Sequence, residues 1–460
     1  MRNRLFILAI LTGWLSASDV LAKIELPDIV GDNMVLQQQT NARLWGKAQA
    51  GATISVKADW LGETIKTKAD KNGQWQLTLI TPTAEKKEHQ IMLSENGQKQ
   101  LKLSRVLIGE VWFASGQSNM EMPLEGFWNC PVNGSNEAIA TAAEHPWVRV
   151  APIKQNGQTK PVETCSGKWQ VPSSETAPYF SATAWFFAQM MQRALDIPIG
   201  IIACAWGGSK VEGWNGSWWH YYTPVIMYNG MLHPLRHYTI RGFLWYQGES
   251  NVGKDQTYPE RLKTMVEVWR KEFGGTAQSL PFYMVEIAPW GGYGDEWLSA
   301  PLFRECQHRA ARLIENSGIV CINDLVESYE VNQIHPAEKR EVGNRLAYMA
   351  LNRTYGRKNI ACDSPEYDRM EVHGDTIEVY FTHAEQGLSP WQDIRGFELS
   401  GADGQFHPAS AILNESHKSV MVTSDEVTAP TAVRYAFKAF LPGNLKSVRG
   451  LPVVPFRSDK

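Results

Sequence analysis

The chain has 460 residues and a formal net charge of −3, with 20% charged and 43% hydrophobic residues. This composition is ordinary for a globular protein, and the length predicts two to four domains of about 150 residues each. Because the charges nearly balance, the chain lacks the basic field that nucleic-acid binding requires, and we expect no nucleic-acid partner.

The first 22 residues have the pattern of a secretory signal peptide. Arg2 and Arg4 precede the apolar run 5–14, and Ala22 ends a short segment suited to cleavage. The run is too short to cross a membrane, and no later apolar run reaches about 18 residues. We therefore expect residues 1–22 to be removed and the mature protein, without a membrane span, to be periplasmic or secreted.

The remaining chain divides by its hydrophobic pattern into three regions. Residues 23–104 show short alternating runs that predict a small β-sandwich, and residues 358–460 return to this pattern as a second β domain. Residues 105–357 alternate near-continuous apolar strands with helices, which predicts an α/β domain with a parallel sheet. Its expected strands are 106–114, 199–205, 240–246, 282–287 and 318–322, and its expected helices are 182–195, 259–273, 300–315 and 337–351.

The six cysteines form no C-x-x-C pair, so we expect no zinc cluster. Cys204 and Cys321 lie in apolar, strand-like runs and are predicted to be buried free thiols. Cys130 and Cys165 lie in loop-like sequence, where export would allow them to form a disulfide.

A candidate nucleophile follows the first strand of the α/β region. The apolar run from Ile108 breaks at Gly116, and Ser118 comes two residues later. A strand that turns sharply at a glycine can expose a serine hydroxyl at the sheet edge, although the G-x-S-x-G elbow is absent. The alternative is a serine that caps a helix after a core strand.

Three more segments follow predicted strands, and they contain Gly207 with Gly208, Asn251 and His335. Ligands of such sheets bind at the carboxyl ends of the strands. Ser118 would attack an ester, and His335 would take its proton and return one to the leaving alcohol. The oxyanion would be stabilised by the N–H groups of Ser118 and of a glycine, and by the Asn251 amide. Each residue alone also fits an ordinary turn or cap.

The sequence motifs around these residues resemble those of the SGNH/GDSL hydrolase superfamily, in particular its sialate O-acetylesterase branch. The matching segments are G-Q-S-N-M (116–120), W-G-G-S-K-V-E-G-W (206–214), Y-Q-G-E-S-N (246–251) and I-H-P-A-E-K-R-E-V-G-N-R-L-A (334–347). The resemblance implies a flavodoxin-like sheet and the removal of O-acetyl groups from sialic acids through an acetyl-enzyme. It implies no cofactor and no metal.

One residue departs from the superfamily pattern, which commonly has Asp three residues before the catalytic histidine. Here that position is Asn332, which could orient His335 through its side-chain oxygen or its backbone carbonyl. Asp324, Glu327 and Glu330 are the other candidates for the orienting group. Since neutral histidine is the base, we expect activity to rise with pH through about 6.5.

Three residues are possible substrate contacts: Gln117, Glu249 and Arg241. Arg241, like Arg270, could pair with the carboxylate of a sialic acid, and Glu249 could bind sugar hydroxyls or, as we favour, brace a loop. An acetylesterase for xylan or another polysaccharide would use the same machinery. A non-catalytic glycan-binding protein is the alternative from another class, and the sequence carries no signal for the oligomeric state.

Overall fold

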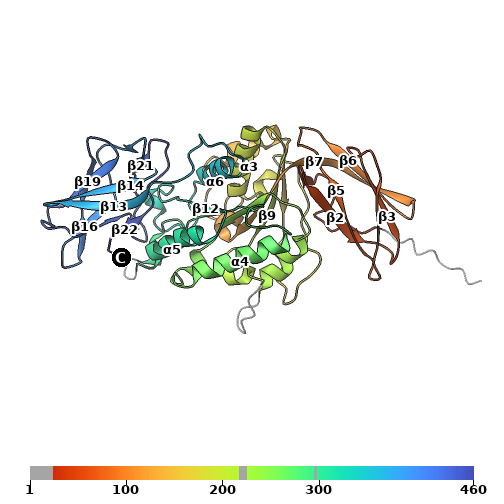
Figure 1. The fold of residues 1–460 in the computed structure, drawn as a ribbon, viewed down its shortest axis with the longest axis horizontal. Helices are drawn as coiled ribbons and strands as arrows, with labels where there is room; N and C mark the ends of the chain where they lie inside the picture. The colour runs from red at the N-terminus through yellow and green to blue at the C-terminus, as the bar shows by residue number, and fades with distance from the viewer. Residues whose placement is uncertain (1–23, 217–224, 295–297, 460) are drawn as a thin grey trace, which may run out of the picture.

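The computed structural model describes residues 24–216, 225–294 and 298–459. An amino-terminal β region, a central α/β region and a carboxyl-terminal β region lie in a row along the long axis (Figure 1). The predicted signal peptide, residues 1–22, lies outside the described residues. Among those described, none of the helices has the length and apolarity needed to cross a membrane.

Six parallel strands form the central sheet, in the order β8-β9-β7-β10-β11-β12. The first of them in the chain, β7, lies inside the sheet, and later strands are added on both of its sides. Such a reversal of strand order creates a crevice at the carboxyl ends of the strands. This confirms the predicted α/β class. The strands are β7 (Gln98–Gly116), β8 (Val148–Pro152), β9 (Ile199–Ala205), β10 (Gly242–Tyr246), β11 (Phe282–Val285) and β12 (Ser317–Val320).

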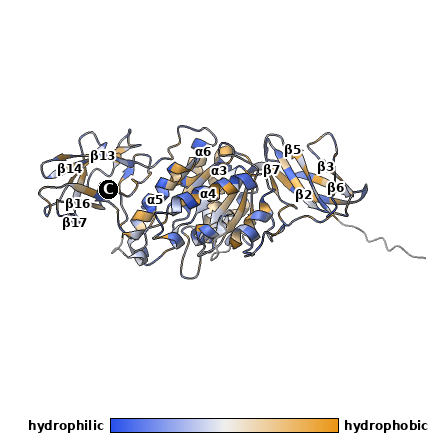
Figure 2. Ribbon diagram, turned by 60° about the horizontal axis from the view of Figure 1, so that its bottom comes forward, coloured by the Kyte–Doolittle hydropathy of each residue, from blue (hydrophilic) through white to orange (hydrophobic). Residues whose placement is uncertain are grey.

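Helices cover both faces of this sheet because its side chains alternate between two hydrophobic clusters. Trp112 and Ala114 face the cluster of α3 (Ala182–Leu195) and α6 (Arg340–Arg353), while Val111 and Phe113 face that of α4 (Tyr258–Glu272) and α5 (Ser299–Leu313). Figure 2 shows the apolar central strands behind helices that carry both polar and apolar residues. Two short helices, α1 (Ser118–Glu121) and α2 (Ser135–Ala140), lie in loops.

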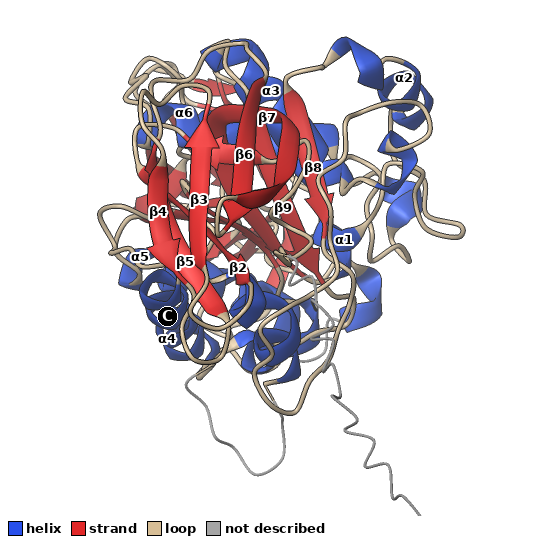
Figure 3. Cartoon of the chain, turned by 90° about the vertical axis from the view of Figure 1, so that its right-hand side faces the viewer, coloured by secondary structure: helices blue, strands red, loops and turns tan. Residues whose placement is uncertain are grey.

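The amino-terminal region shares a strand with the central sheet. The first half of β7 pairs antiparallel with β6, and its second half pairs with β9 and β10, so the predicted boundary at 104/105 falls inside one strand. Figure 3 looks along this region onto the central sheet. The remaining strands are β1 (Val35–Gln37), β2 (Asn41–Lys47), β3 (Thr53–Ala58), β4 (Ile65–Lys68), β5 (Gln74–Ile80) and β6 (His89–Glu95).

The carboxyl-terminal region consists of two four-stranded antiparallel sheets and a two-stranded ribbon. Ile377 and Val379 of one sheet pack with Leu399 and Val433 of the other in a single core. One sheet contains β13 (Glu366–His373), β14 (Thr376–Thr382), β18 (Ser410–Leu413) and β19 (Ser419–Thr423). The other contains β16 (Phe397–Ser400), β17 (Phe406–Pro408), β20 (Ala432–Tyr435) and β22 (Phe456–Arg457), and the ribbon is β15 (Leu388–Ser389) with β21 (Lys446–Ser447).

Candidate active site

The four predicted segments all follow carboxyl ends of central strands. Ser118 opens α1 after β7, Gly207 follows β9, Asn251 ends a short 3-10 turn after β10, and His335 lies in the loop between β12 and α6. The last residue of β7 is in register with the last residues of β9 and β10. Since the strands are parallel, these segments meet at one edge of the sheet.

The turn that presents Ser118 requires a glycine. Gly116 has a φ of 140°, and a Cβ there would lie 2.1 Å from the carbonyl oxygen of Tyr246. The next residue, Gln117, is buried, and its Oε1 accepts hydrogen bonds from the N–H groups of Gly248 (3.2 Å) and Ser250 (3.3 Å). Gln117 therefore fixes the loop after β10, which favours a structural role over the predicted substrate contact.

Gly207 packs directly against the candidate nucleophile. A Cβ on Gly207 would lie 3.6 Å from the Ser118 Cβ, while Gly208 has a φ of 68° and faces open space. The Gly207 N–H donates a hydrogen bond to Glu121, whose other carboxylate oxygen accepts one from Gln155 (2.7 Å). Burial raises the pKa of Glu121. The glycine amide predicted to face the oxyanion is therefore bound to a carboxylate here.

The side chain of Asn251 is buried beneath the loop that follows β9. Its Oδ1 accepts hydrogen bonds from the Val211 N–H (3.0 Å) and from Gln247 (2.7 Å), and its Nδ2 donates to Glu212 (3.0 Å). Glu212 is in turn paired with Arg261. An amide nitrogen carries two protons, and the second has no hydrogen-bond partner within the described part of the chain. The amide is thus held in one orientation with a proton still available.

His335 is seated against the segment that follows α1. The edge of its ring meets Phe127, with the ring centroids 5.3 Å apart and an interplanar angle of 71°. Its Nδ1 lies 3.9 Å from the Sγ of Cys130. Glu330 closes the histidine loop, since its carboxylate accepts the N–H groups of Glu327 (2.8 Å) and Ala337 (2.9 Å).

A buried polar network connects the serine turn to the histidine loop. Asn119 donates from Nδ2 to Glu249 (2.6 Å) and to the carbonyl of Ile334 (3.1 Å), and its Oδ1 accepts from Lys339 (2.7 Å). Burial raises the pKa of Glu249 and lowers that of Lys339 to about 7. Glu249 therefore holds the Asn119 side chain in place, which favours the predicted role in bracing the loop over substrate binding.

Comparison with known proteins identifies the family. A model of the family described as carbohydrate esterase, sialic acid-specific acetylesterase, matches residues 108–352. The chain belongs to this family. Human sialate O-acetylesterase is 27% identical over 418 residues, which cover 81% of this chain and 79% of the human protein. The mouse sialate O-acetylesterase is 24% identical over 447 residues and covers 81% of each chain.

A solved structure confirms the fold of this esterase. The crystal structure of a carbohydrate acetylesterase from Xanthomonas citri is 32% identical, with a TM-score of 0.85, and covers 95% of this chain and all of the other. The SGNH-like α/β fold and the carboxylic ester hydrolase class, both expected from the motifs, are confirmed. The alternative of a non-catalytic glycan-binding protein is set aside by the same findings.

The surroundings of His335 change the expected pH dependence of the esterase. Burial, followed by the charge of Lys339, lowers the pKa of His335 to about 4, well below the 6.5 of a free histidine. Only the neutral ring accepts a proton, so kcat/KM should rise with pH through about 4 and be level from about 5.5 to 8. Initial rates with p-nitrophenyl acetate across this range measure it. A midpoint near 6.5 would show that the ring is exposed to water in solution.

Neither Asn332 nor Asp324 orients the histidine in this structure. Asn332 is exposed, and within the described residues its side chain has no hydrogen bond to His335. Asp324 is buried in a bidentate pair with Arg345 (2.7 and 2.8 Å) and also contacts Lys446 (2.7 Å). These two cations hold the Asp324 pKa below its usual value. The aspartate therefore stabilises the fold of the esterase, which corrects its predicted role.

Single substitutions of Asn332 and Asp324 distinguish a role in catalysis from a role in stability. Asn332→Ala is expected to change kcat less than about threefold, since only a solvated side chain is lost. Asp324→Ala should lower the free energy of unfolding by about 3–5 kcal/mol, because the buried Arg345 loses its bidentate partner and is left with the longer 3.4 Å contact with Glu341. Denaturant unfolding and kcat for p-nitrophenyl acetate measure both. A fall in kcat of about 10⁴ for the folded Asp324 variant would restore it as a triad acid.

Arg241 lies at the opposite edge of the sheet from Ser118, which corrects its predicted role as a substrate contact. It immediately precedes β10, and its guanidinium forms a bidentate pair with the buried Glu110 (Nη2 to Oε1, 3.0 Å). Glu110 also accepts hydrogen bonds from Gln38 (2.6 Å) and Tyr355 (2.8 Å). The arginine thus neutralises a buried carboxylate far from the candidate nucleophile.

All six cysteines are free thiols. The predicted burial of Cys204 and Cys321 is confirmed. Cys130 and Cys165, which export would allow to form a disulfide, are not bonded to each other, because they pack against hydrophobic clusters on opposite faces of the sheet.

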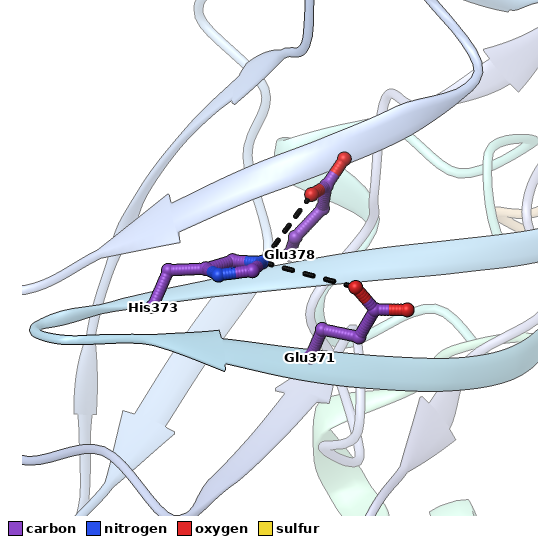
Figure 4. A group of neighbouring side chains, drawn as sticks. All are labelled: Glu371, His373 and Glu378. Carbon is purple, nitrogen blue, oxygen red and sulfur yellow. Dashed lines mark ion pairs between the residues drawn. The ribbon is translucent and has the colours of Figure 1, made fainter.

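A group of metal-ligand type lies far from this site, on the β13–β14 hairpin. Glu371, His373 and Glu378 are drawn in Figure 4, and the His373 Nε2 lies 3.9 and 3.6 Å from oxygens of the two glutamates. Glu371 is already paired with Arg369, and Glu378 accepts a hydrogen bond from Ser419. Glu371 and His373 are exposed to solvent and Glu378 is half-buried, and we assign the group no metal.

Sequence analysis missed three residues that shape the site: Glu121, Lys339 and Cys130. Glu121 and Lys339 lie close to recognised motif residues, three positions after Ser118 and four after His335. For Glu121 that spacing, about one turn of α1, was the available signal, whereas Lys339 precedes α6 and has no helical spacing to His335. Cys130 lies 205 residues from His335 in the chain, and no local pattern connects them.

Proposed function

We propose that this esterase removes O-acetyl groups from carbohydrates, with Ser118 as nucleophile and His335 as general base. The observation that supports it is the meeting of the serine turn, Gly207, Asn251 and the histidine loop at one edge of the sheet. Acetyl release by the wild-type enzyme, abolished by Ser118→Ala, tests it.

In the proposed reaction the Ser118 Oγ attacks the acetyl carbonyl carbon while His335 takes the hydroxyl proton. The tetrahedral intermediate collapses, the C–O bond to the sugar breaks, and His335 returns the proton to the sugar oxygen. A water molecule, deprotonated by His335, then attacks the acetyl-enzyme, and acetate leaves as the Ser118 Oγ regains a proton.

The oxyanion would be stabilised by two donors, the Ser118 backbone N–H and the free proton of the Asn251 amide. The first opens α1 and has no backbone partner within the described residues. Gly207 could contribute a third donor only when Glu121 releases its amide. Each well-placed donor is worth about 2.7–4 kcal/mol in the transition state.

Sialic acids acetylated on a hydroxyl are the leading substrate class, because the human and mouse relatives are sialate O-acetylesterases. Acetylated xylan or another polysaccharide is the second class. One observation favours it: Arg241 is bound to Glu110, and Arg270 to the backbone carbonyls of Leu280 and Glu315, so neither can meet a sialic acid carboxylate.

A direct comparison of substrates decides between the two classes. Acetylated sialic acids released from mucin and acetylated xylan would be incubated with equal enzyme, and the products separated by chromatography. Deacetylation of the sialic acids at the higher kcat/KM is expected. Acetate release from xylan alone would establish the second class instead.

Trp128 offers a flat apolar face beside the site. Its side chain is 95% exposed, and its neighbour Phe127 packs on His335. Stacked contacts on an aromatic face contribute roughly 0.5–1.5 kcal/mol. Trp128→Ala should therefore raise KM for an acetylated glycan about two- to tenfold and leave kcat for p-nitrophenyl acetate unchanged. The matched control is Trp391→Ala, since Trp391 is also exposed (67%) but lies in the carboxyl-terminal region. Equal effects of the two substitutions would exclude Trp128 from the site.

We also propose that residues 1–22 direct export, which would bring the enzyme to glycans outside the cytoplasm. Arg2 and Arg4, followed by the apolar run 5–14, support this. Mass spectrometry of the protein purified from its native host should give a first residue of Lys23; an intact Met1 would contradict it.

A further inference from the structure

We propose that the thiol of Cys130 orients His335, in the place where a catalytic triad has a carboxylate. This inference rests on the proposed function, in which His335 is the base. The Cys130 Sγ lies 3.9 Å from the His335 Nδ1 and 3.2 Å from the Gln333 Oε1. The thiol thus lies between the His335 Nδ1 and the neutral Gln333 Oε1. In serine hydrolases Nδ1 is the ring nitrogen that faces away from the nucleophile.

The position of Cys130 relative to the ring is fixed by several contacts. Phe127 and Cys130 exchange backbone hydrogen bonds of 3.0 and 2.9 Å, which close a tight turn. Phe127 holds the ring of His335 from the side, and Gln333 donates from Nε2 to the carbonyl of Asn129 (3.2 Å). The turn and the histidine loop therefore form one unit, although about 200 residues separate them in the chain.

The hydrogen-bonding chemistry of this group has one consistent direction. Gln333 uses its amide N–H on Asn129, so its oxygen is free to accept, and the thiol proton of Cys130 points to it. The sulfur then accepts from the Nδ1–H of His335. This arrangement places the ring proton on Nδ1 and leaves Nε2 unprotonated, which is the tautomer that a general base requires.

Ionised groups around the ring do not replace the thiol. Lys339 is the buried cation that acts on His335, and it is balanced by Glu249 and Glu330. Glu330 is bound to backbone N–H groups, and within the described residues no carboxylate forms a hydrogen bond with the ring. A neutral thiol fixes the tautomer but, unlike a carboxylate, adds little stabilisation to the imidazolium.

This difference supplies the test. Cys130→Ala removes the acceptor and should lower kcat for p-nitrophenyl acetate about tenfold with KM unchanged. Cys130→Ser keeps a donor and an acceptor and should stay within about threefold of wild type. Cys130→Asp places a carboxylate at Nδ1 and should move the acidic limb of the kcat/KM profile up by about one pH unit or more.

The matched control is Asn129→Asp. Asn129 is exposed in the same turn with a φ of 58°, which aspartate tolerates. The added charge should move the acidic limb by less than about 0.3 pH unit, because solvent screens it. Circular dichroism and thermal unfolding verify that each variant is folded.

The inference fails if the folded Cys130→Asp variant keeps the wild-type acidic limb, or moves it no further than Asn129→Asp does. It also fails if Cys130→Ala keeps the wild-type kcat. Where Cys130→Asp does not fold, the contrast between serine and alanine decides: equal losses would show only a packing role. Retained activity in Ser118→Ala would overturn the proposed function and this inference with it, whereas its loss with unchanged Cys130 variants would overturn the inference alone.

Discussion

Ser118→Ala and His335→Ala are each expected to lower kcat for an acetyl ester by about 10⁴-fold or more, with the fold intact. Ser118 supplies the attacking oxygen, and without His335 its hydroxyl keeps its proton. Stopped-flow and steady-state assays with p-nitrophenyl acetate measure the effect. In the wild type, an initial burst of nitrophenol would report the acetyl-enzyme.

The double variant should lose no more than either single variant, because the two residues act as a unit. Ser250→Ala is the matched control, since Ser250 is another serine at this edge of the sheet whose hydroxyl has no assigned role. Retention of a tenth of the activity by Ser118→Ala would remove Ser118 from the mechanism. Losses that multiply would show that the serine and the histidine work independently.

Asn251→Ala should lower kcat by about 10²–10³ with little change in KM. The lost amide proton acts on charge that exists only in the transition state. The measurement is a full rate profile against substrate concentration for an acetylated sugar. An increase in KM alone would make Asn251 a substrate contact.

The Asn251 side chain also anchors the loop after β9, so a control for loop movement is needed. Glu212→Gln keeps an oxygen acceptor for the Asn251 amide while it removes the charge that pairs with Arg261. This variant should remain within about fivefold of wild type. A loss as large as that of Asn251→Ala would place the effect in the loop rather than in the oxyanion.

Much of the fold could be predicted because buried parallel strands have near-continuous apolar sequences. The bounds of β9 and α3 agree with prediction at both ends. The strand β8 was missed because it is short, contains Arg149 and ends in a proline. Helix α6 begins at Arg340 rather than at residue 337, because the Ala337 N–H is bound by the Glu330 carboxylate and the chain is still in its loop.

The sequence predicted where the candidate site lies, but not which side chains contact one another there. Motif order placed Ser118 and His335 at the carboxyl ends of strands, which the topology explains. The partners of each side chain come from other loops, and sequence spacing carries no information on them. Arg241 and Asp324 looked available as single residues, yet each is bound to an opposite charge 131 or 21 positions away.

The strand β7 spans 19 residues from the amino-terminal sheet to Gly116, the glycine before the nucleophile turn, with a register shift near Arg105, whose φ is 56°. Separation of the two regions within β7 would leave strand edges in both of them without hydrogen-bond partners. We therefore expect the amino-terminal region not to fold as a separate unit. Heat or denaturant should therefore unfold the amino-terminal and central regions together, in one cooperative transition. The position of Ser118 therefore depends on a strand that begins in the amino-terminal region.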